Sequence, residues 1–129
     1  MDWLLKSDPE EYGFDDLLSD KTTVWDGVAN AVAVKHLASM KKGDRIVVYH
    51  SGGERAAVGL ATVAGAPAAD PESPKLSVVP IRAGRRLKTP VTLETIKESS
   101  LFADSPLLRM GRLSVVPLTP EQYAFVTGD

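Results

Sequence analysis

The segment His50-Ser51-Gly52-Gly53 is the part of this chain closest to a hydrolase site, since a histidine adjoins a serine in a glycine-bearing turn. Neighbouring residues of a strand point to opposite faces of a sheet, so His50 is poorly placed to take a proton from Ser51. The GxSxG pattern of a nucleophile elbow is also absent. Because no base, nucleophile and orienting group converge in the sequence, we expect a non-enzyme.

Metal and cofactor chemistry find no better support in the sequence. The two histidines, His36 and His50, lie at neither helical nor hairpin spacing for a shared metal ion. The chain has no cysteine, which excludes thiolate zinc sites, iron–sulfur clusters and cysteine nucleophiles. Neither GxGxxG nor GxxxxGKS/T occurs, so no nucleotide-cofactor loop is expected. We predict that the protein binds no metal and no cofactor.

Polar residues set among apolar ones are more informative. Lys6 and Ser7 end an apolar run, and Trp25 lies ahead of a helical pattern that Asn30 begins. A buried amide without partners costs about 1–3 kcal/mol, so Asn30 either bonds nearby backbone or faces a ligand. Trp25 either belongs to the core or offers a flat face worth about 1–3 kcal/mol per stacked base. Both alternatives stay open at this point.

The apolar pattern predicts short strands interleaved with short helices. Strands are expected at 3–5, 46–49, 58–63, 76–81 and 113–116, and Pro80 confines the fourth to an edge or a bulge. A turn at 51–54 joins the second and third of them. Helices are expected after Asp8, at 14–18, over about eleven residues from Asn30, at 92–98 and after Thr119. This mixture favours a small barrel decorated by helices over a doubly wound sheet.

The length of 129 residues fits one domain spanning 1–129. With 15 Lys and Arg against 17 Asp and Glu, the chain as a whole is not an electrostatic nucleic-acid binder. Residues 1–26 are strongly acidic, whereas Arg82, Arg85, Arg86 and Lys88 form either a solvated loop or a positive strip beside a site. No apolar run approaches the ~20 residues of a membrane span. We expect a soluble, cytoplasmic protein that is a monomer or weak dimer.

Several short sequence blocks occur in order along residues 3–123. They are Trp3-Leu-Leu-Lys-Ser-Asp-Pro, Tyr12-Gly-Phe-Asp-Asp-Leu, Trp25-Asp-Gly-Val-Ala-Asn, Met40-Lys-Lys-Gly-Asp, Tyr49-His-Ser, Val58-Gly-Leu-Ala-Thr-Val, Pro90-Val-Thr-Leu and Arg112-Leu-Ser-Val-Val-Pro. Together they resemble the EVE-domain family, which is related to the YTH domains that hold a methylated base in an aromatic cage. The resemblance implies an α+β fold, a PUA-like small twisted β-barrel with flanking short helices. It also implies that Lys6, Ser7 and Trp25 match the Lys-Ser and tryptophan of the YTH pocket.

The chain departs from the usual family pattern after Trp25. An arginine usually follows Trp-Asp-Gly-Val and an aromatic residue usually follows the asparagine, whereas this chain has Ala29 and Ala31. In this segment the resemblance therefore implies fewer phosphate contacts and fewer cage rings than in the family.

These observations lead to one functional hypothesis and one alternative. The hypothesis is a reader that binds a modified base of DNA or RNA, either flipped out of a duplex or single-stranded. The alternative is a small-molecule or nucleotide-binding regulatory domain, or an uncharacterised enzyme, that uses the same pocket. The expected pocket residues are Lys6, Ser7, Trp25, Asn30, Tyr49, His50, Ser51, Arg112, Leu113 and Ser114, with Arg82, Arg85, Arg86 and Lys88 as candidate phosphate contacts.

Overall fold

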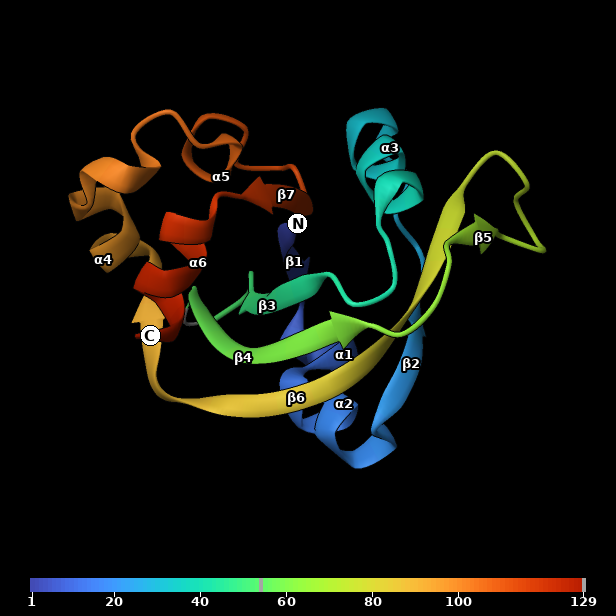
Figure 1. Cartoon of the computed structure of the whole chain (residues 1–129), viewed down its shortest axis with the longest axis horizontal. Helices are drawn as coiled ribbons and strands as arrows, with labels where there is room; N and C mark the ends of the chain where they lie inside the picture. Colours follow the sequence, from blue (N-terminus) through green and yellow to red (C-terminus); the bar gives the residue numbers. More distant parts are fainter. Residues whose placement is uncertain (54, 129) are drawn as a thin grey trace.

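The computed structural model describes residues 1–53 and 55–128, so Glu54 of the expected turn lies outside the described residues. A mixed sheet of 7 strands forms its centre, in the order β2-β6-β4-β3-β1-β7, with β5 added beside β6 (Figure 1). The strands are β1 (Asp2–Ser7), β2 (Thr22–Trp25), β3 (Arg45–His50), β4 (Ala56–Val63), β5 (Ala68–Ala69), β6 (Ser77–Thr92) and β7 (Val115–Leu118). The helices are α1 (Pro9–Tyr12), α2 (Phe14–Asp20), α3 (Ala31–Ser39), α4 (Leu93–Glu98), α5 (Pro106–Arg109) and α6 (Pro120–Thr127), with a 3₁₀ turn η1 at Ser100–Phe102. The predicted α+β class is confirmed.

The three strands β1, β3 and β7 form the buried part of the sheet. β1 is parallel to β3 and antiparallel to β7, so that Leu4 lies opposite both Val47 and Val116. All three of these side chains are fully buried. Strands covered on both faces consist of nearly continuous apolar runs, which is why these segments are evident in the sequence.

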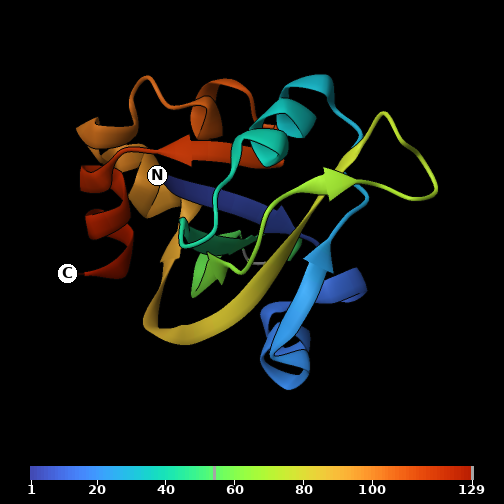
Figure 2. The same ribbon diagram turned by 45° about the vertical axis from the view of Figure 1, so that its right-hand side comes forward.

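The sheet curls strongly but does not close (Figure 2). The register shifts between Val48 and Tyr49 on β3, and again on both sides of Gly59 on β4. Such bulges increase the local twist of a sheet. Among the described strands β2 and β7 remain as the two edges, and α3 contacts both β6 and β7. The expected twisted barrel is therefore open between β2 on one side and the β1–β7 pair on the other.

Two helices begin at the capping residues that the sequence predicts, α1 after Asp8 and α6 after Thr119. The side chain of Asp8 accepts a hydrogen bond from the backbone N–H of Glu10 at 2.9 Å, ahead of α1. Thr119 and Gln122 form the expected reciprocal capping box of α6, with N···O distances of 2.9 and 3.1 Å. α3 has 9 residues, fewer than predicted, because Met40 already has extended backbone angles. Within the described residues, no helix has the length and apolar character that crossing a membrane requires.

β6 differs most from its prediction. It runs for 16 residues with β2 on one side and β4 on the other. The strand was predicted to end at Ile81 and to lie at an edge or a bulge, and a solvated loop was one alternative for the basic residues of 82–88; all of these residues instead belong to one paired strand. Pro80 is tolerated because its carbonyl accepts the N–H of Ala64 at 2.8 Å, on the side where β4 has already ended. The N–H and C=O of one strand residue point to the same side, so the missing N–H of Pro80 breaks no bond between strands.

A smaller difference concerns the last strand. β7 begins at Val115, two residues later than predicted, and it includes Pro117 at the edge of the sheet. The carbonyl of Ser114 still accepts the backbone N–H of Lys6 at 2.9 Å. Ser114 therefore lies beside the end of β1, just ahead of β7.

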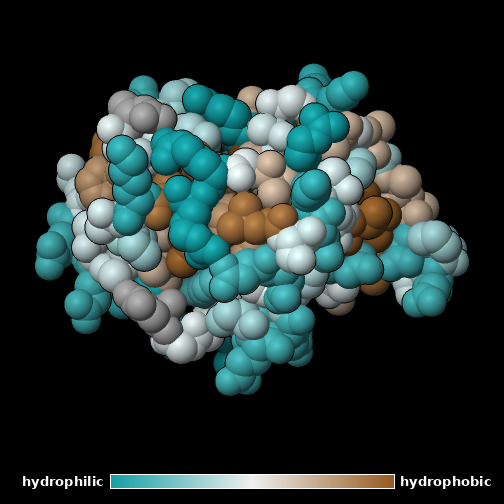
Figure 3. Space-filling model, turned by 90° about the horizontal axis from the view of Figure 1, so that it is seen from below, coloured by the Kyte–Doolittle hydropathy of each residue, from teal (hydrophilic) through white to brown (hydrophobic). Residues whose placement is uncertain are grey.

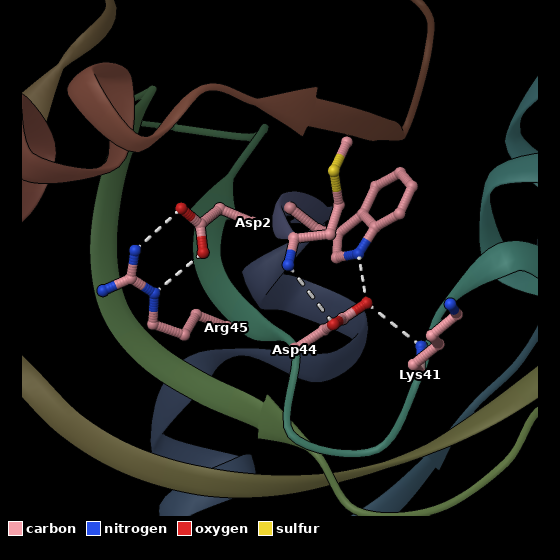
Figure 4. A network of polar contacts seen from close by, with 6 residues as sticks. Asp2, Lys41, Asp44 and Arg45 are labelled. Atoms are coloured by element: carbon pink, nitrogen blue, oxygen red, sulfur yellow. Dashed lines mark hydrogen bonds and ion pairs between the residues drawn. The ribbon is translucent and has the colours of Figure 1, made fainter.

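A polar network ties the start of β1 to the start of β3 (Figure 4). The Asp44 carboxylate accepts hydrogen bonds at 3.0 Å from the indole Nε1 of Trp3 and from the backbone N–H of Lys41. Asp2 accepts two bonds at 2.8 Å from Arg45, whose guanidinium also lies 3.9 Å from the ring centre of Tyr123 on α6. This end of the β1–β3 pair is thus occupied by contacts that hold the fold together.

The surface seen from below is mostly hydrophilic (Figure 3). Apolar side chains show on this face as small patches between polar ones. Large continuous apolar patches are typical of protein or membrane interfaces. This face does not have that character.

Candidate functional site

A cavity of about 440 Å³, called here the Trp25 cavity, opens where the curled sheet fails to close. The end of β1, helix α1, β2 and the segment after β2 supply its walls. Its lining includes Lys6, Ser7, Tyr12, Trp25, Val28 and Ser114. β1 and β2 are not neighbours in the sheet, so only the curl brings them to one cavity. The volume lies within the range of about 300–1,000 Å³ that is typical of ligand pockets.

Two aromatic rings form one wall of the Trp25 cavity. Tyr12 and Trp25 have ring centres 6.4 Å apart and an interplanar angle of 82°, an edge-to-face pair. The Tyr12 hydroxyl donates to Asp20 at 2.7 Å, which fixes the ring from the side of α2. Trp25 is only 9% exposed and packs in the hydrophobic core, yet it also lines the cavity. The core alternative for Trp25 therefore holds, and the residue also borders the cavity.

Ser7 supplies an unsatisfied polar atom at the cavity. Its Oγ is buried and has no hydrogen-bond partner within the described part of the chain. The backbone carbonyl of Ser7, by contrast, accepts the N–H of Ser51 at 2.9 Å and the Ser51 hydroxyl at 3.3 Å. An unpaired buried hydroxyl costs about 1–3 kcal/mol. Ser7 is also among the residues that line the Trp25 cavity, so the unpaired hydroxyl belongs to a residue of its wall.

The charges around the Trp25 cavity are divided between its two sides. Asp8, Glu11 and Asp26 line it on the side of α1 and of the segment after β2. On the other side, the Lys6 ammonium donates to the Gly111 carbonyl at 2.8 Å and lies 5.9 Å from the ring centre of Tyr49. Burial lowers the pKa of Lys6, and the nearby Arg55 cation lowers it further. An anionic group would therefore approach this cavity from the side of Lys6.

The structure brings together only part of the expected pocket. Lys6, Ser7, Trp25 and Ser114 line the Trp25 cavity, whereas Tyr49 and Ser51 line a neighbouring one. Leu113 is buried in the core, and Arg112 is exposed in the loop between Gly111 and Ser114. Tyr12 was missed as a site residue because its contact with Trp25 depends on how α1 packs near β2. The only sign of it in the sequence is that it begins one of the blocks resembling the family.

Asn30 and His50 make contacts that hold helices, and neither is among the residues lining the Trp25 cavity. The Asn30 side chain is exposed, and its Oδ1 caps α3 by accepting the N–H groups of Val32 at 2.9 Å and Ala33 at 3.2 Å. The expectation of a buried Asn30 amide is wrong, because the residue lies ahead of the helix and outside its apolar face. His50 Nε2 accepts the backbone N–H of Phe14 at 3.0 Å, at the start of α2.

These contacts also bear on the hydrolase alternative. The accepting nitrogen of His50 is already engaged by Phe14, and the Ser51 hydroxyl donates to the Ser7 carbonyl. The two side chains therefore do not form a base and nucleophile pair. In the part of the chain that the structure describes, no group of three His, Asp or Glu side chains is placed to hold a metal ion.

The bond to His50 predicts a pH dependence of stability. Burial lowers the pKa of His50, with Arg86 also lowering it and Asp15 opposing them. The unfolded side chain titrates near pH ~6.5, so the unfolded state binds more protons below that pH. The contribution to the free energy of unfolding is thus complete above about pH 6.5 and is lost as the pH falls through the lowered folded pKa. Urea unfolding at about pH 7.5 and about pH 5 should show this loss.

A glutamine at position 50 is the matched variant, since its amide oxygen can still accept the Phe14 N–H without titrating. His50→Gln should reduce the difference in stability between the two pH values. Burial also lowers the pKa of His36, so the comparison is best made in a His36→Gln background. An unchanged pH dependence in His50→Gln would contradict the assignment.

The basic residues of 82–88 do not form one strip beside the Trp25 cavity. Arg86 pairs with Asp15 and lies 5.5 Å from the ring centre of Phe14. Arg85 and Lys88 line a different cavity, of about 720 Å³, between β6 and α6. Arg82 is exposed opposite Thr22. The expectation of a compact strip is wrong because an extended strand spreads these residues along its length and over both faces.

The fold and the cavity define a class of small α+β domains with a curled mixed sheet and a pocket at its open side. The chain belongs to the EVE-domain family, since its residues 2–128 match the family model of the EVE domain. Thymocyte nuclear protein 1 from Gallus gallus is 32% identical over 160 residues, covering 96% of this chain and 66% of that protein. The chain therefore spans slightly less than two thirds of the length of this relative.

Solved structures show the same architecture. Rpa0253 from Rhodopseudomonas palustris superposes with a TM-score of 0.92 and 36% identity, covering 98% of this chain and 90% of that one. The structure of human THYN1 in complex with 5-methylcytosine-containing DNA has a TM-score of 0.83 and 28% identity, covering 98% and 95%. The chain therefore shares the fold of these two proteins.

Proposed function

We propose that this protein is a non-enzymatic reader of a modified nucleobase, which it accepts in the Trp25 cavity. The observation that carries the proposal is the coincidence, in one cavity, of an aromatic wall and the unpaired Ser7 hydroxyl. A related domain that is 28% identical has been solved with DNA containing 5-methylcytosine, so a 5-methylcytosine base is the first ligand to test.

Each wall of the cavity offers one kind of contact to such a base. The indole of Trp25 provides a face for stacking, and the Tyr12 ring stands edge-on beside it. The hydroxyls of Ser7 and Ser114 can bond the polar edge of the base. Val28 adds an apolar surface, which is the kind of contact that a methyl group on a base prefers.

The base must leave its stack to reach these groups. The aromatic wall lies inside the opening of the sheet, and Asp8, Glu11 and Asp26 at one side would repel the phosphates of an intact duplex. Proteins that bind a base in a closed pocket take it from a single strand or flip it out, which costs a few kcal/mol in a paired duplex. We therefore expect tighter binding to single-stranded or mismatched sites than to fully paired ones.

The direct test is a comparison of oligonucleotides that differ in one base. Fluorescence anisotropy with single-stranded DNA and RNA carrying cytosine, 5-methylcytosine, 5-hydroxymethylcytosine or N6-methyladenine gives the preference. The proposal expects at least one modified base to bind tighter than its unmodified form. Equal binding of every modified and unmodified pair, or no binding at low salt, would overturn it.

Ser7→Ala separates function from folding. Because the Ser7 hydroxyl is buried without a partner, its removal is expected to leave the free energy of unfolding unchanged or raise it by about 1 kcal/mol. Affinity for the preferred oligonucleotide should instead fall about tenfold, as one hydrogen bond of about 1.4 kcal/mol is lost. Chemical denaturation and anisotropy measure the two effects on the same samples. A variant that is less stable than the wild type and binds equally well would contradict this role.

The acidic side of the cavity favours a second candidate, a domain that binds a small neutral or cationic metabolite. Salt distinguishes the two functions. A reader with several phosphate contacts loses affinity steeply as salt rises, whereas a binder of a neutral metabolite does not. Binding of the free modified nucleoside as tightly as the oligonucleotide, with no salt dependence, would favour the metabolite.

A further inference from the structure

A second cavity, called here the basic cavity, adjoins the Trp25 cavity. It has a volume of about 300 Å³ and is lined by Lys6, Arg55 and Lys97 together with Tyr49, Ser51 and Gly111. Lys6 lines both cavities, so its ammonium stands between them. The two cavities therefore meet at Lys6, which is on the side of the Trp25 cavity that has no carboxylate.

Three separate parts of the chain hold these cations together. Lys6 is the residue before the last of β1, and its ammonium donates to the Gly111 carbonyl at 2.8 Å. Arg55 precedes β4, and its carbonyl accepts the backbone N–H of Leu93 at 2.9 Å. That bond ties Arg55 to the start of α4, the helix that carries Lys97. The arrangement thus depends on the fold and is not a run of basic residues in the sequence.

The residues that the structure describes do not neutralise the charges of the basic cavity. Within residues 1–53 and 55–128, no ion pair engages Lys6, Arg55 or Lys97. No carboxylate is among the described residues lining this cavity. Burial lowers the pKa of Lys6, and the Arg55 cation on the same cavity lowers it further. An anion bound between them would relieve this repulsion.

We propose that the basic cavity binds a phosphate group next to the base held in the Trp25 cavity. The polynucleotide backbone then leaves the base site across Lys6 toward Arg55 and Lys97. Asp8, Glu11 and Asp26, which line the Trp25 cavity but not the basic cavity, would repel phosphates there. This inference rests on the proposed function, and it adds the direction of the strand and two cations, Arg55 and Lys97, that the expected phosphate contacts did not include.

The ligand class that fits this pair of cavities is a single strand with one modified base. Guanidinium and ammonium groups bind phosphate oxygens by charge-assisted hydrogen bonds, with Arg able to donate two in parallel. The Ser51 hydroxyl and the Tyr49 ring also line the basic cavity and could contact the sugar that joins base and phosphate. A free nucleoside would fill only the Trp25 cavity and would gain nothing from Arg55 and Lys97.

The test uses the double variant Arg55→Gln/Lys97→Gln and single-stranded DNA with one 5-methylcytosine. We expect about a tenfold or greater loss of affinity at about 50 mM salt, and a salt slope that is smaller by about 1.4, corresponding to two phosphate contacts on a single strand. Affinity for the free nucleoside 5-methyl-2′-deoxycytidine should not change. Lys41→Gln/Lys42→Gln is the matched control, since it removes the same charge from exposed residues at the other end of β3. Its affinity for the oligonucleotide should stay within about twofold of the wild type.

The outcomes separate this inference from the function on which it rests. Wild-type protein that prefers the modified oligonucleotide, with the Arg55→Gln/Lys97→Gln protein showing the same affinity and salt slope, would overturn the phosphate path alone. An equal loss in the Lys41→Gln/Lys42→Gln control would also overturn it, because the effect would then come from overall charge. Wild-type protein that binds no modified oligonucleotide would overturn both proposals.

Discussion

Replacing Trp25 by leucine is expected to weaken binding of the preferred modified oligonucleotide by about 10- to 100-fold, because a flat stacking face is worth about 1–3 kcal/mol per base. Leucine keeps an apolar side chain against the core that the indole contacts. Alanine is the poorer variant, since Trp25 is only 9% exposed and truncation of a core tryptophan costs about 3–5 kcal/mol. Anisotropy with the folded leucine variant measures the stacking contribution free of unfolding.

Trp3 is the matched control for this substitution. It is also buried in the core, but it lies at the opposite end of β1, where its indole donates to Asp44 at 3.0 Å. Trp3→Leu is expected to reduce stability without changing affinity. In a Trp3→Phe background, Trp25 is the only tryptophan, so its fluorescence should be quenched when the base binds. Wild-type affinity in Trp25→Leu would exclude stacking on this residue.

Gly59→Ala is expected to lower the free energy of unfolding by about 3 kcal/mol, the upper part of the range for overpacking a core. A Cβ at this position of β4 would overlap the tip of the Phe14 ring. Phe14 is fully buried, its backbone N–H bonds His50, and Arg86 stands over its ring, so the ring has little freedom to move aside. Urea denaturation of the wild type and the variant measures the loss.

Two further variants test whether the clash is the cause. Gly111→Ala should change stability by less than about 0.5 kcal/mol, since nothing lies within 4 Å of a Cβ there. Phe14→Leu removes the tip of the ring, so the double variant with Gly59→Ala should lose less stability than the two single losses added together, by about 1–2 kcal/mol. Additive losses would show that Gly59 is required for another reason.

The local elements of this protein follow from its sequence. Asn30, Thr92 and Thr119 each cap the helix that begins after them, because an N-cap side chain bonds backbone only two or three residues away. The β-branched runs of β3 and β4 are likewise evident, since apolar strands buried on both faces need no distant information to be recognised. The expected overall architecture came from the ordered sequence blocks that resemble the EVE-domain family.

The candidate site was only partly evident in the sequence. Lys6 and Ser7 could be named because they end an apolar run, and Trp25 because it lies ahead of a helical pattern. The family resemblance pointed to the same three residues. Tyr12 as the ring beside Trp25, and Arg55 and Lys97 beside Lys6, could not be named. These contacts join residues that are distant in sequence, and no local periodicity reports them.

The course of β6 is another feature that only the tertiary structure shows. Its basic residues look like a loop in the sequence because they interrupt the apolar alternation, yet β2 and β4 pair with them through backbone bonds that do not depend on side-chain type. The sequence by itself determined that helices start after Asp8, Asn30 and Thr119 and that the segments of β1, β3 and β4 are strands. Only the tertiary structure decided that the sheet curls without closing, which leaves the opening that Ser7 and Trp25 both line and beside which the cations gather. The physical reason is that capping and burial are local properties, whereas the curl is set by bulges and pairings between distant strands.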